Sequence, residues 1–154
     1  MAAIIPNPRK TFNWSISFPT HPINAFLCQR VTLPEKEIEA VSHGDTNHDI
    51  KTAGRITFSN LIVEKLSTTS GSDTWFHNWL YSCQDPIIGG GLTPSAYKET
   101  MIVQELAEDG VTVLNTHILE GVFPVKGGGE ELDRTSSDNI IEHLEFSVDT
   151  MDKY

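Results

Sequence analysis

The sequence predicts a mainly β protein, with two packed antiparallel sheets (a β-sandwich or barrel) and one flanking α-helix. Three observations predict this class. Apolar and polar residues alternate in several short segments, which is the period of a strand with one buried face. One segment places its apolar residues at the spacing of a helix. The chain has 154 residues, 38% of them hydrophobic and 21% charged, so we expect a single globular domain over residues 1–154.

The alternation is clearest at residues 11–18, which form the first expected strand. The side chains expected to face the core from this strand are Phe12, Trp14, Ile16 and Phe18. Pro19 and Pro22 end the strand, because proline has no N–H to donate to a sheet. Further strands are expected, in order, at residues 23–33, 35–42, 55–66, 97–106, 111–125 and 139–150. The last of these should bury Leu144, Phe146 and Val148.

The spacing of apolar residues changes at 70–83, which predicts the one helix. Its apolar face consists of Trp75, Phe76, Trp79, Leu80 and Cys83. The candidate capping residues at its start are Ser70, Ser72 and Asp73. Loops are expected at 87–94 and 126–138, and Glu108-Asp109-Gly110 should form a hairpin turn.

The polar stretch at 43–54, HGDTNHDIKTAG, contains the chemical groups of a metal site. Asp45, Asn47 and Asp49 alternate as in a calcium-binding loop, but Ile50 stands where such a loop needs glycine. A small metal-dependent enzyme is the alternative interpretation, with four ligand-type residues: His43, Asp45, His48 and Asp49. Because spacing alone rarely makes a site, we expect neither a metal nor a cofactor.

The formal net charge is −10, which disfavours a protein that holds nucleic acid by neutralising its phosphates. No segment of the sequence is long and apolar enough for a membrane-spanning helix, so we expect no membrane insertion. The sequence also lacks a nucleophile elbow and a zinc-protease helix motif, and no catalytic residue is assigned. Cys28 and Cys83 are expected to be buried thiols, with a disulfide between them left open.

The order of these elements resembles that of the tail tube proteins of phages with contractile tails. The resemblance covers nearly the whole chain, through FNWSISF, then INAFLCQRV, then the acidic EKEIEAVS. In that family a lysine, a glycine and a basic residue precede an I-T-F/L strand. The matching positions are Lys51, Gly54, Arg55 and Ile56-Thr57-Phe58. A helix with Trp75 and Trp79, and the closing IIEHLEFSVDTMDKY, complete the series.

The resemblance implies a structural subunit and not an enzyme. Protomers of this family form hexameric rings, and the rings stack into a hollow tube through which DNA passes on ejection. The implied partners are further copies of the chain, a contractile sheath, a baseplate or tube initiator, a tape-measure protein and a tail terminator. The implied location is the virion tail, after assembly in the host cytoplasm. The inner tube of a phage-like bacteriocin or a secretion apparatus is the related alternative.

In such a tube we expect residues 43–54 to form an arm that reaches a neighbouring ring and becomes ordered when it docks. The residues expected to contact other protomers are His43, Asp45, Asn47, His48, Asp49, Lys51 and Arg55. The acidic charge predicts a channel wall that repels DNA phosphates. The candidates to face this channel are acidic residues expected on strands: Glu37, Glu39, Glu99, Glu105, Glu142 and Glu145.

Overall fold

The computed structural model describes residues 11–19, 28–67, 74–127 and 132–154. The strands in these ranges are β1 Trp14–Ser17, β2 Cys28–Thr32, β3 Lys36–Gly44, β4 Asp49–Phe58, β5 Leu61–Leu66, β6 Glu99–Leu106, β7 Val113–Lys126, β8 Ile141–Ser147 and β9 Thr150–Lys153. The helices are α1 Trp75–Cys83 and α2 Pro94–Tyr97. Every strand pair is antiparallel.

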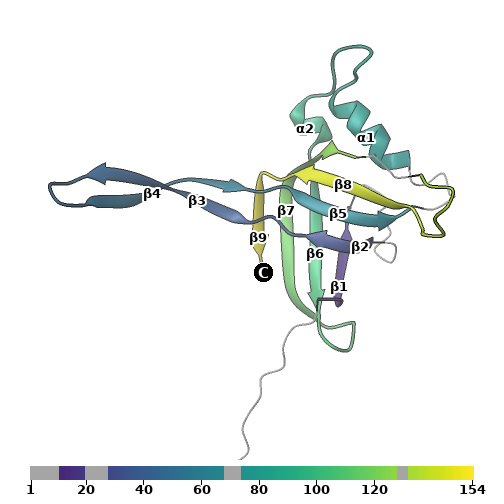
Figure 1. The fold of residues 1–154 in the computed structure, drawn as a ribbon, viewed down its shortest axis with the longest axis horizontal. Coiled ribbons are helices and arrows are strands. Elements are labelled where there is room, and N and C mark those ends of the chain that lie inside the picture. Colours follow the sequence, from purple (N-terminus) through teal and green to yellow (C-terminus); the bar gives the residue numbers. More distant parts are fainter. Residues whose placement is uncertain (1–10, 20–27, 68–73, 128–131) are drawn as a thin grey trace, which may run out of the picture.

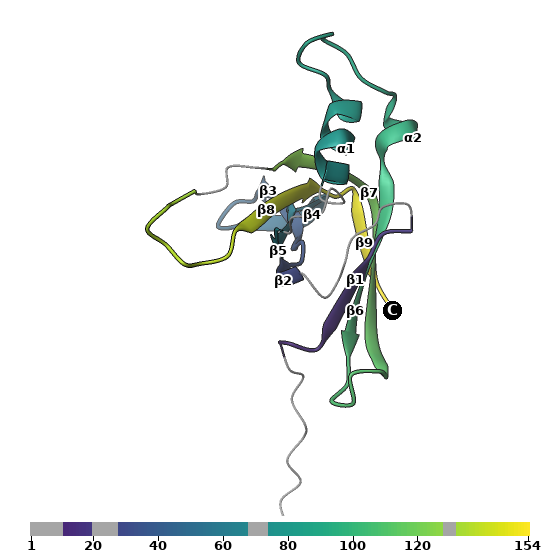
Figure 2. The ribbon, with the colours of Figure 1, turned by 90° about the vertical axis from the view of Figure 1, so that its right-hand side faces the viewer.

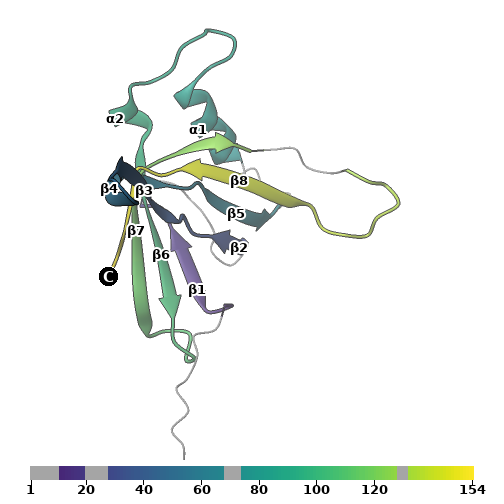
Figure 3. The ribbon, with the colours of Figure 1, turned by 60° about the vertical axis from the view of Figure 1, so that its left-hand side comes forward.

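The body of the protein consists of two sheets that share one long strand. Sheet A has the order β1-β6-β7-β9, and sheet B has the order β7-β8-β5-β2. Figure 1 shows the strands of sheet A running across β5 and β8 of sheet B, and Figures 2 and 3 show the two sheets as separate layers. This is the crossed packing in which a bent strand passes from one sheet to the other. The expected pair of antiparallel sheets is therefore confirmed.

The bend that carries β7 between the sheets is at Gly121. Glu99 pairs with Val122 and Met101 with Leu119, so β7 has one extra residue at this point and forms a bulge. Gly121 has φ +66°, a backbone conformation that residues with a Cβ rarely adopt. A Cβ at this position would also collide with the side chain of Asp149. Glycine is therefore required where the strand leaves sheet A.

The core lies between the two sheets and under α1. The fully buried side chains of the core include Leu61, Phe76, Met101, Leu119 and Phe146. The core-facing residues predicted for 139–150 are confirmed, because Leu144, Phe146 and Val148 are all buried. The sheets thus bury the alternate side chains that the period-two pattern identifies.

Helix α1 covers one end of the core, above the end of β7 and β8 in Figure 1. Phe76 and Trp79 are its buried residues, one turn apart. The ring of Phe76 lies 5.4 Å from that of Phe146, and Trp79 lies 5.4 Å from Phe18, both edge to face. The Trp79 indole Nε1 donates a hydrogen bond to the Tyr97 carbonyl at 2.8 Å. The helix prediction is confirmed, and its three candidate caps lie outside the described residues.

Two of the expected strands are each divided in the structure. The expected strand at 55–66 belongs to β4 and β5, which separate at Ser59-Asn60. Most of the expected strand at 139–150 forms β8, and its last residue, Thr150, begins β9 after a break at Val148-Asp149. At the first break the chain passes from the β3–β4 hairpin into sheet B, and at the second it passes from sheet B into sheet A. Local alternation does not signal such a change of layer.

Smaller differences concern the ends of elements. β1 begins at Trp14, and Phe12, expected in the core, precedes the strand and is 74% exposed. The short helix α2, with Pro94 in its first turn, was not expected. Of the expected strand at 23–33, residues 23–27 lie outside the described part of the chain. Cys28 and Cys83 are not joined in a disulfide. Within the described residues, neither helix has the length and apolarity needed to cross a membrane.

Candidate functional site: the β3–β4 arm and the open sheet

The most prominent surface feature is the hairpin formed by β3 and β4, named the arm here. Figure 1 shows it projecting from the body beyond β9, across the direction of the sheet A strands. The arm continues the β2–β5 pair outward. At its base the Ser59 Oγ accepts a hydrogen bond from the Glu35 N–H at 2.7 Å, and the Ser59 N–H donates to the Glu35 carbonyl at 3.1 Å. An isolated two-stranded ribbon without a covered face is only marginally stable in water.

Residues 43–54, expected to form an arm, lie in the outer part of this hairpin, and β3 and β4 extend further into the stretch than the strands expected at 35–42 and 55–66. Only Asp45–His48 form the turn, and the residues on either side are paired strand residues. The Asp45 N–H donates to the His48 carbonyl at 3.0 Å, which closes the turn. The polar composition of this stretch comes from solvent exposure on both faces of the hairpin, because all of β3 and all of β4 except Phe58 is exposed.

A β-bulge in the arm determines which side chains lie on each of its two faces. Ile38 pairs with Ile56 and Ala40 with Ala53, so Gly54 and Arg55 together stand opposite Glu39. Ala53 and Ile56 are three positions apart and would otherwise lie on opposite faces, because strand side chains alternate. The extra residue therefore brings them to the same face. A Cβ on Gly54 would lie 2.9 Å from Val41 Cγ2, so this crowded position favours glycine.

The two faces of the arm differ in chemistry. The apolar face carries Ile38, Ala40, Ala53 and Ile56, with Lys36 near the body and Lys51, followed by Asp49, toward the tip. The opposite, polar face carries Glu37, Glu39, His43 and Arg55 together with Val41 and Ile50. An exposed apolar face flanked by lysines, on a chain of net charge −10, is suited to contact another copy of the same acidic protein.

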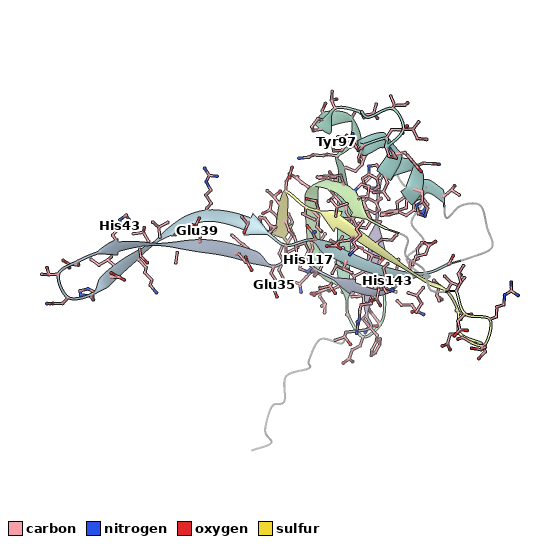
Figure 4. The ribbon with its side chains drawn as sticks, turned by 45° about the horizontal axis from the view of Figure 1, so that its top comes forward. Glu35, Glu39, His43, Tyr97, His117 and His143 are labelled. Atoms are coloured by element: carbon pink, nitrogen blue, oxygen red, sulfur yellow. The ribbon has the colours of Figure 1, made fainter. Side chains whose placement is uncertain are left out.

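The contact residues expected from the sequence are all exposed on the arm. Asp45, Asn47 and His48 lie at the tip, and Asp49 begins β4. Lys51 is on the apolar face, whereas Arg55 and His43 are on the polar one. Figure 4 shows His43 far out along the arm, with Glu39 nearer the body and Glu35 at the base. Sequence reasoning missed the isoleucines of the apolar face, since their common side depends on the bulge.

The residues of the metal alternative are not gathered into a site. His43 is opposite Ile50 and Asp49 opposite Gly44, which places His43 and Asp49 on different faces of the ribbon. Across the four described ranges, no group of three His, Cys, Asp or Glu side chains is arranged to hold a metal ion.

Sheet A is open at both edges within the described residues. β1 pairs only with β6, and β9 pairs only with β7. Tyr154 and Thr116 exchange backbone hydrogen bonds of 2.7 and 2.8 Å. Because alternate residues point their N–H groups the same way, the N–H groups of Met151 and Lys153 point away from β7. The outer edge of β9 therefore presents unpaired donors and acceptors, as does β1, and such edges invite pairing with another chain.

One face of sheet A is also uncovered, as Figure 2 shows on the side away from sheet B. The residues of β1, β6, β7 and β9 that alternate with the buried ones are Ser15, Ser17, Thr100, Ile102, Gln104, Thr116, Ile118, Glu120, Thr150 and Asp152. Glu120 and Asp152 are exposed carboxylates, and this described set contains no lysine or arginine. The open face is thus hydroxyl-rich and acidic.

The structure does not bring the six expected channel acids together. Glu37 and Glu39 lie on the arm, and Glu145, on the far side of sheet B, accepts a hydrogen bond from the Asn60 amide at 2.9 Å. Glu99 and Glu105 share the side of β6 that holds Met101 and Val103. Glu105 Oε1 lies 3.6 Å from Nε2 of the buried His117. These acids belong to several surfaces.

Glu142, which was expected to face the channel, is instead buried inside the protomer. It is buried and forms an ion pair with Lys65, so its charge is neutralised inside the protomer. Sequence reasoning missed Glu120 and Asp152, which are the acids of the open face. Their alternation with Leu119 and Met151 is the signal that could have identified them.

Open edges and an exposed arm define a subunit that is completed by other chains. Residues 10–152 match the model of the T4-like virus tail tube protein gp19 family. The tail tube protein gp19 of Enterobacteria phage T4 is 30% identical over 118 residues, which cover 75% of this chain and 72% of that protein. The corresponding protein of Enterobacteria phage T6 is 29% identical over 118 residues, with the same coverage. The chain belongs to the T4-like virus tail tube protein gp19 family, and the tail tube role expected from the sequence, structural and not enzymatic, is confirmed.

Solved structures with the same fold come from related tubular assemblies. The tube-terminating cap of the anti-feeding prophage superposes with a TM-score of 0.82 at 13% identity, covering 100% of this chain and 95% of that chain. The sheath-tube complex of the PVC extracellular contractile injection system in its extended state gives a TM-score of 0.77 at 16% identity, covering 96% and 91% of the two chains. At these identities the likeness shows a shared fold.

Proposed function

We propose that this tail tube protein closes into hexameric rings by pairing β9 of each protomer with β1 of the next. The observation that carries the proposal is the presence of two open edges on one sheet. Sheet A contains four strands that alternate in direction, so β1 and β9 are antiparallel to each other. Rotation about an axis along the strands therefore places β9 beside β1 of a neighbour in an antiparallel pair, which continues the pattern around the ring.

The arm supports the same arrangement. It leaves the body past β9, the edge where the next protomer would add (Figure 1). We assign its apolar face to contact with that neighbour, and the inter-ring reach expected from the sequence stays a prediction. A marginal hairpin that docks only on another copy would make assembly depend on a growing ring, which keeps single protomers apart.

The channel wall in this arrangement is the open face of sheet A. Glu120 and Asp152 would then repeat in every protomer and repel the phosphates of passing DNA, while the hydroxyl groups offer no strong binding site. In this arrangement Glu120 and Asp152 would face the channel in place of the six acids expected from the sequence. These two acids are chosen because they lie on the face of sheet A that is turned away from sheet B and has no covering layer (Figure 2).

The proposed partners are those of a contractile tail: sheath, baseplate and terminator, with the virion tail as the location. Support comes from the sources of similar structures, which are described as a sheath-tube complex, a sheath/tube terminator and a baseplate. The tape-measure protein, passage of DNA and assembly in the host cytoplasm remain predictions.

Ring closure is tested at Lys153, whose N–H points outward from β9. Lys153→Pro removes this donor without removing a hydrogen bond to β7, whereas Lys153→Ala keeps it. We expect rings and tubes from the wild type and Lys153→Ala in negative-stain electron microscopy, and monomers from Lys153→Pro. Normal rings from Lys153→Pro would refute closure through β9.

The channel wall is tested by charge reversal. Tubes of Glu120→Lys should retain DNA that nuclease cannot digest, because the introduced cations would face the channel. Tubes of Glu145→Lys, with the same change on the far side of sheet B, should not. Equal protection of DNA in both variants would remove sheet A from the channel.

The arm is tested by deleting Asp45–Asp49, which removes the turn and the start of β4. The shortened protein should remain folded by circular dichroism and should fail to form tubes. Long tubes from this variant would rule out an assembly role for the outer part of the arm.

A further inference from the structure

Two ordered turns lie at opposite ends of sheet A. The segment 85–92 precedes α2 and the start of β6, and the turn at 107–112 joins the end of β6 to β7. Figures 1 to 3 agree in showing the first beside the helices and the second at the far end of the sheet. In a ring with its axis along these strands, the two turns would face the rings above and below.

The turn beside the helices holds two isoleucines in solvent. Asp85 Oδ1 accepts hydrogen bonds from the Ile87 N–H at 2.8 Å and the Ile88 N–H at 3.4 Å. The Asp85 backbone N–H also donates to the Gly90 carbonyl at 2.7 Å. Ile87 is 89% exposed and Ile88 is 82% exposed. The turn is therefore organised by internal hydrogen bonds, yet its largest side chains contact almost nothing in the protomer.

The turn at the other end is built in the same way. Asp109 Oδ1 accepts hydrogen bonds of 2.9 Å from the N–H groups of both Val111 and Thr112. Val111 is 80% exposed. Phe12 lies at the same end of sheet A. The residue after it, Asn13, accepts a hydrogen bond through its carbonyl from the Leu106 N–H at 2.9 Å. Val113 and Leu114 are exposed as well, so this end presents a second apolar surface.

We propose that Ile87 and Ile88 of each protomer dock against the Val111 and Phe12 surface of a second copy in the adjacent ring. This inference rests on the proposed ring. Two different apolar surfaces at opposite ends of one subunit make a head-to-tail contact that does not close on itself, so stacking continues indefinitely. Each copy carries a charge of −10, and a contact made through apolar side chains does not depend on pairing opposite charges across the interface.

The internal hydrogen bonds of both turns favour this role. Aspartate hydrogen bonds fix the backbone before docking, so little conformational entropy is lost when the surfaces meet. Exposed apolar residues that are grouped mark an interaction surface more often than single ones do, and each turn end presents at least two of them.

The first test separates stacking from ring closure. Ile87→Ser/Ile88→Ser should form single rings with few or no tubes, in negative stain and by sedimentation. Leu132→Ser, which changes another highly exposed apolar residue away from both turns, should form tubes of normal length. Normal tubes from the double variant would overturn the inference, and so would loss of rings as well as tubes. Absence of rings from the wild type would instead refute the proposed function.

The second test identifies the two surfaces directly. Ile87→Cys/Val111→Cys, with Cys28 and Cys83 replaced by serine, should give disulfide-linked ladders in assembled tubes under mild oxidation. Ile87→Cys/Leu132→Cys in the same background should give none. Tubes that form with no ladder from the first pair would show that the two turns do not meet.

Discussion

Lys65 Nζ lies 3.2 Å from Glu142 Oε2 in the interior of sheet B, and the two side chains are 3% and 9% exposed. The residues stand directly opposite each other on β5 and β8. Ser67 Oγ donates to the other Glu142 oxygen at 3.4 Å. The pair lies on the core side of β5, in line with Leu61 and Val63. A buried charge is tolerated here because its counterion is in place.

Lys65→Met should lower the free energy of unfolding by about 3–5 kcal/mol, because it leaves the Glu142 carboxylate buried without its partner. Adding Glu142→Leu should recover most of this loss, since two apolar residues can pack where the ion pair lay. Urea unfolding of the two variants measures both effects. A double variant no more stable than the single one would show that the loss arises from packing and not from the isolated charge.

Gly121→Ala should destabilise the protein by roughly 1–2 kcal/mol from the backbone alone, because φ at this position is +66°. Displacement of the Asp149 side chain should add to this. Gly110→Ala is the matched control, with φ +73° and no atom within 4 Å of the added Cβ. Thermal unfolding of both variants isolates the collision. Equal losses would mean that Asp149 moves aside without cost.

The apolar face of the arm should govern assembly strength. Ile38→Ser/Ile56→Ser should raise the protein concentration needed for tube formation by about tenfold or more, since two side chains lose their burial. Glu37→Gln/Thr57→Ser alters the adjacent cross-strand pair on the polar face, and it should change the concentration needed for tube formation far less. Sedimentation of tubes across a concentration series gives the threshold. A larger effect from the second variant would assign docking to the polar face.

Asp109 should titrate well below its usual range. The Thr112 hydroxyl, and the N–H groups of Val111 and Thr112, donate to its carboxylate and lower the pKa from 3.8 to about 2. Because the folded pKa lies below the unfolded one, this contribution to stability is complete above pH 3.8 and is lost as the pH falls through about 2. Asp109→Asn should therefore be less stable than the wild type near neutral pH, and the gap should narrow in acid.

Thermal unfolding from neutral pH to about pH 2 measures that gap, and carboxyl NMR gives the Asp109 midpoint directly. Glu108→Gln, which removes a neighbouring negative charge of the same turn, serves as the control. A stability gap independent of pH would show that the carboxylate charge does not hold the turn.

Much of the fold is readable from local pattern. The alternation at Ile16 and Phe18, the helical spacing of Phe76 and Trp79, and the turn at Asp109-Gly110 all identify their elements, because these signals act between residues close in sequence. An arm was expected at 43–54, but the strands that extend through most of it were not. Its strands bury nothing in the protomer, so the polar composition of an exposed hairpin resembles that of a loop.

The sequence by itself determined the mainly β class, helix α1 and the family resemblance, since each depends on short-range periodicity or on the order of segments. Only the tertiary structure decided which side chains share a surface. A bulge at Gly54-Arg55 puts Ile38 and Ile56 in one patch with Ala53, a bend at Gly121 divides β7 between two sheets, and the pairing of β5 with β8 buries Glu142 against Lys65. Strand register and layer depend on contacts between residues distant in the chain, and one extra residue in a strand reverses the face of every side chain beyond it.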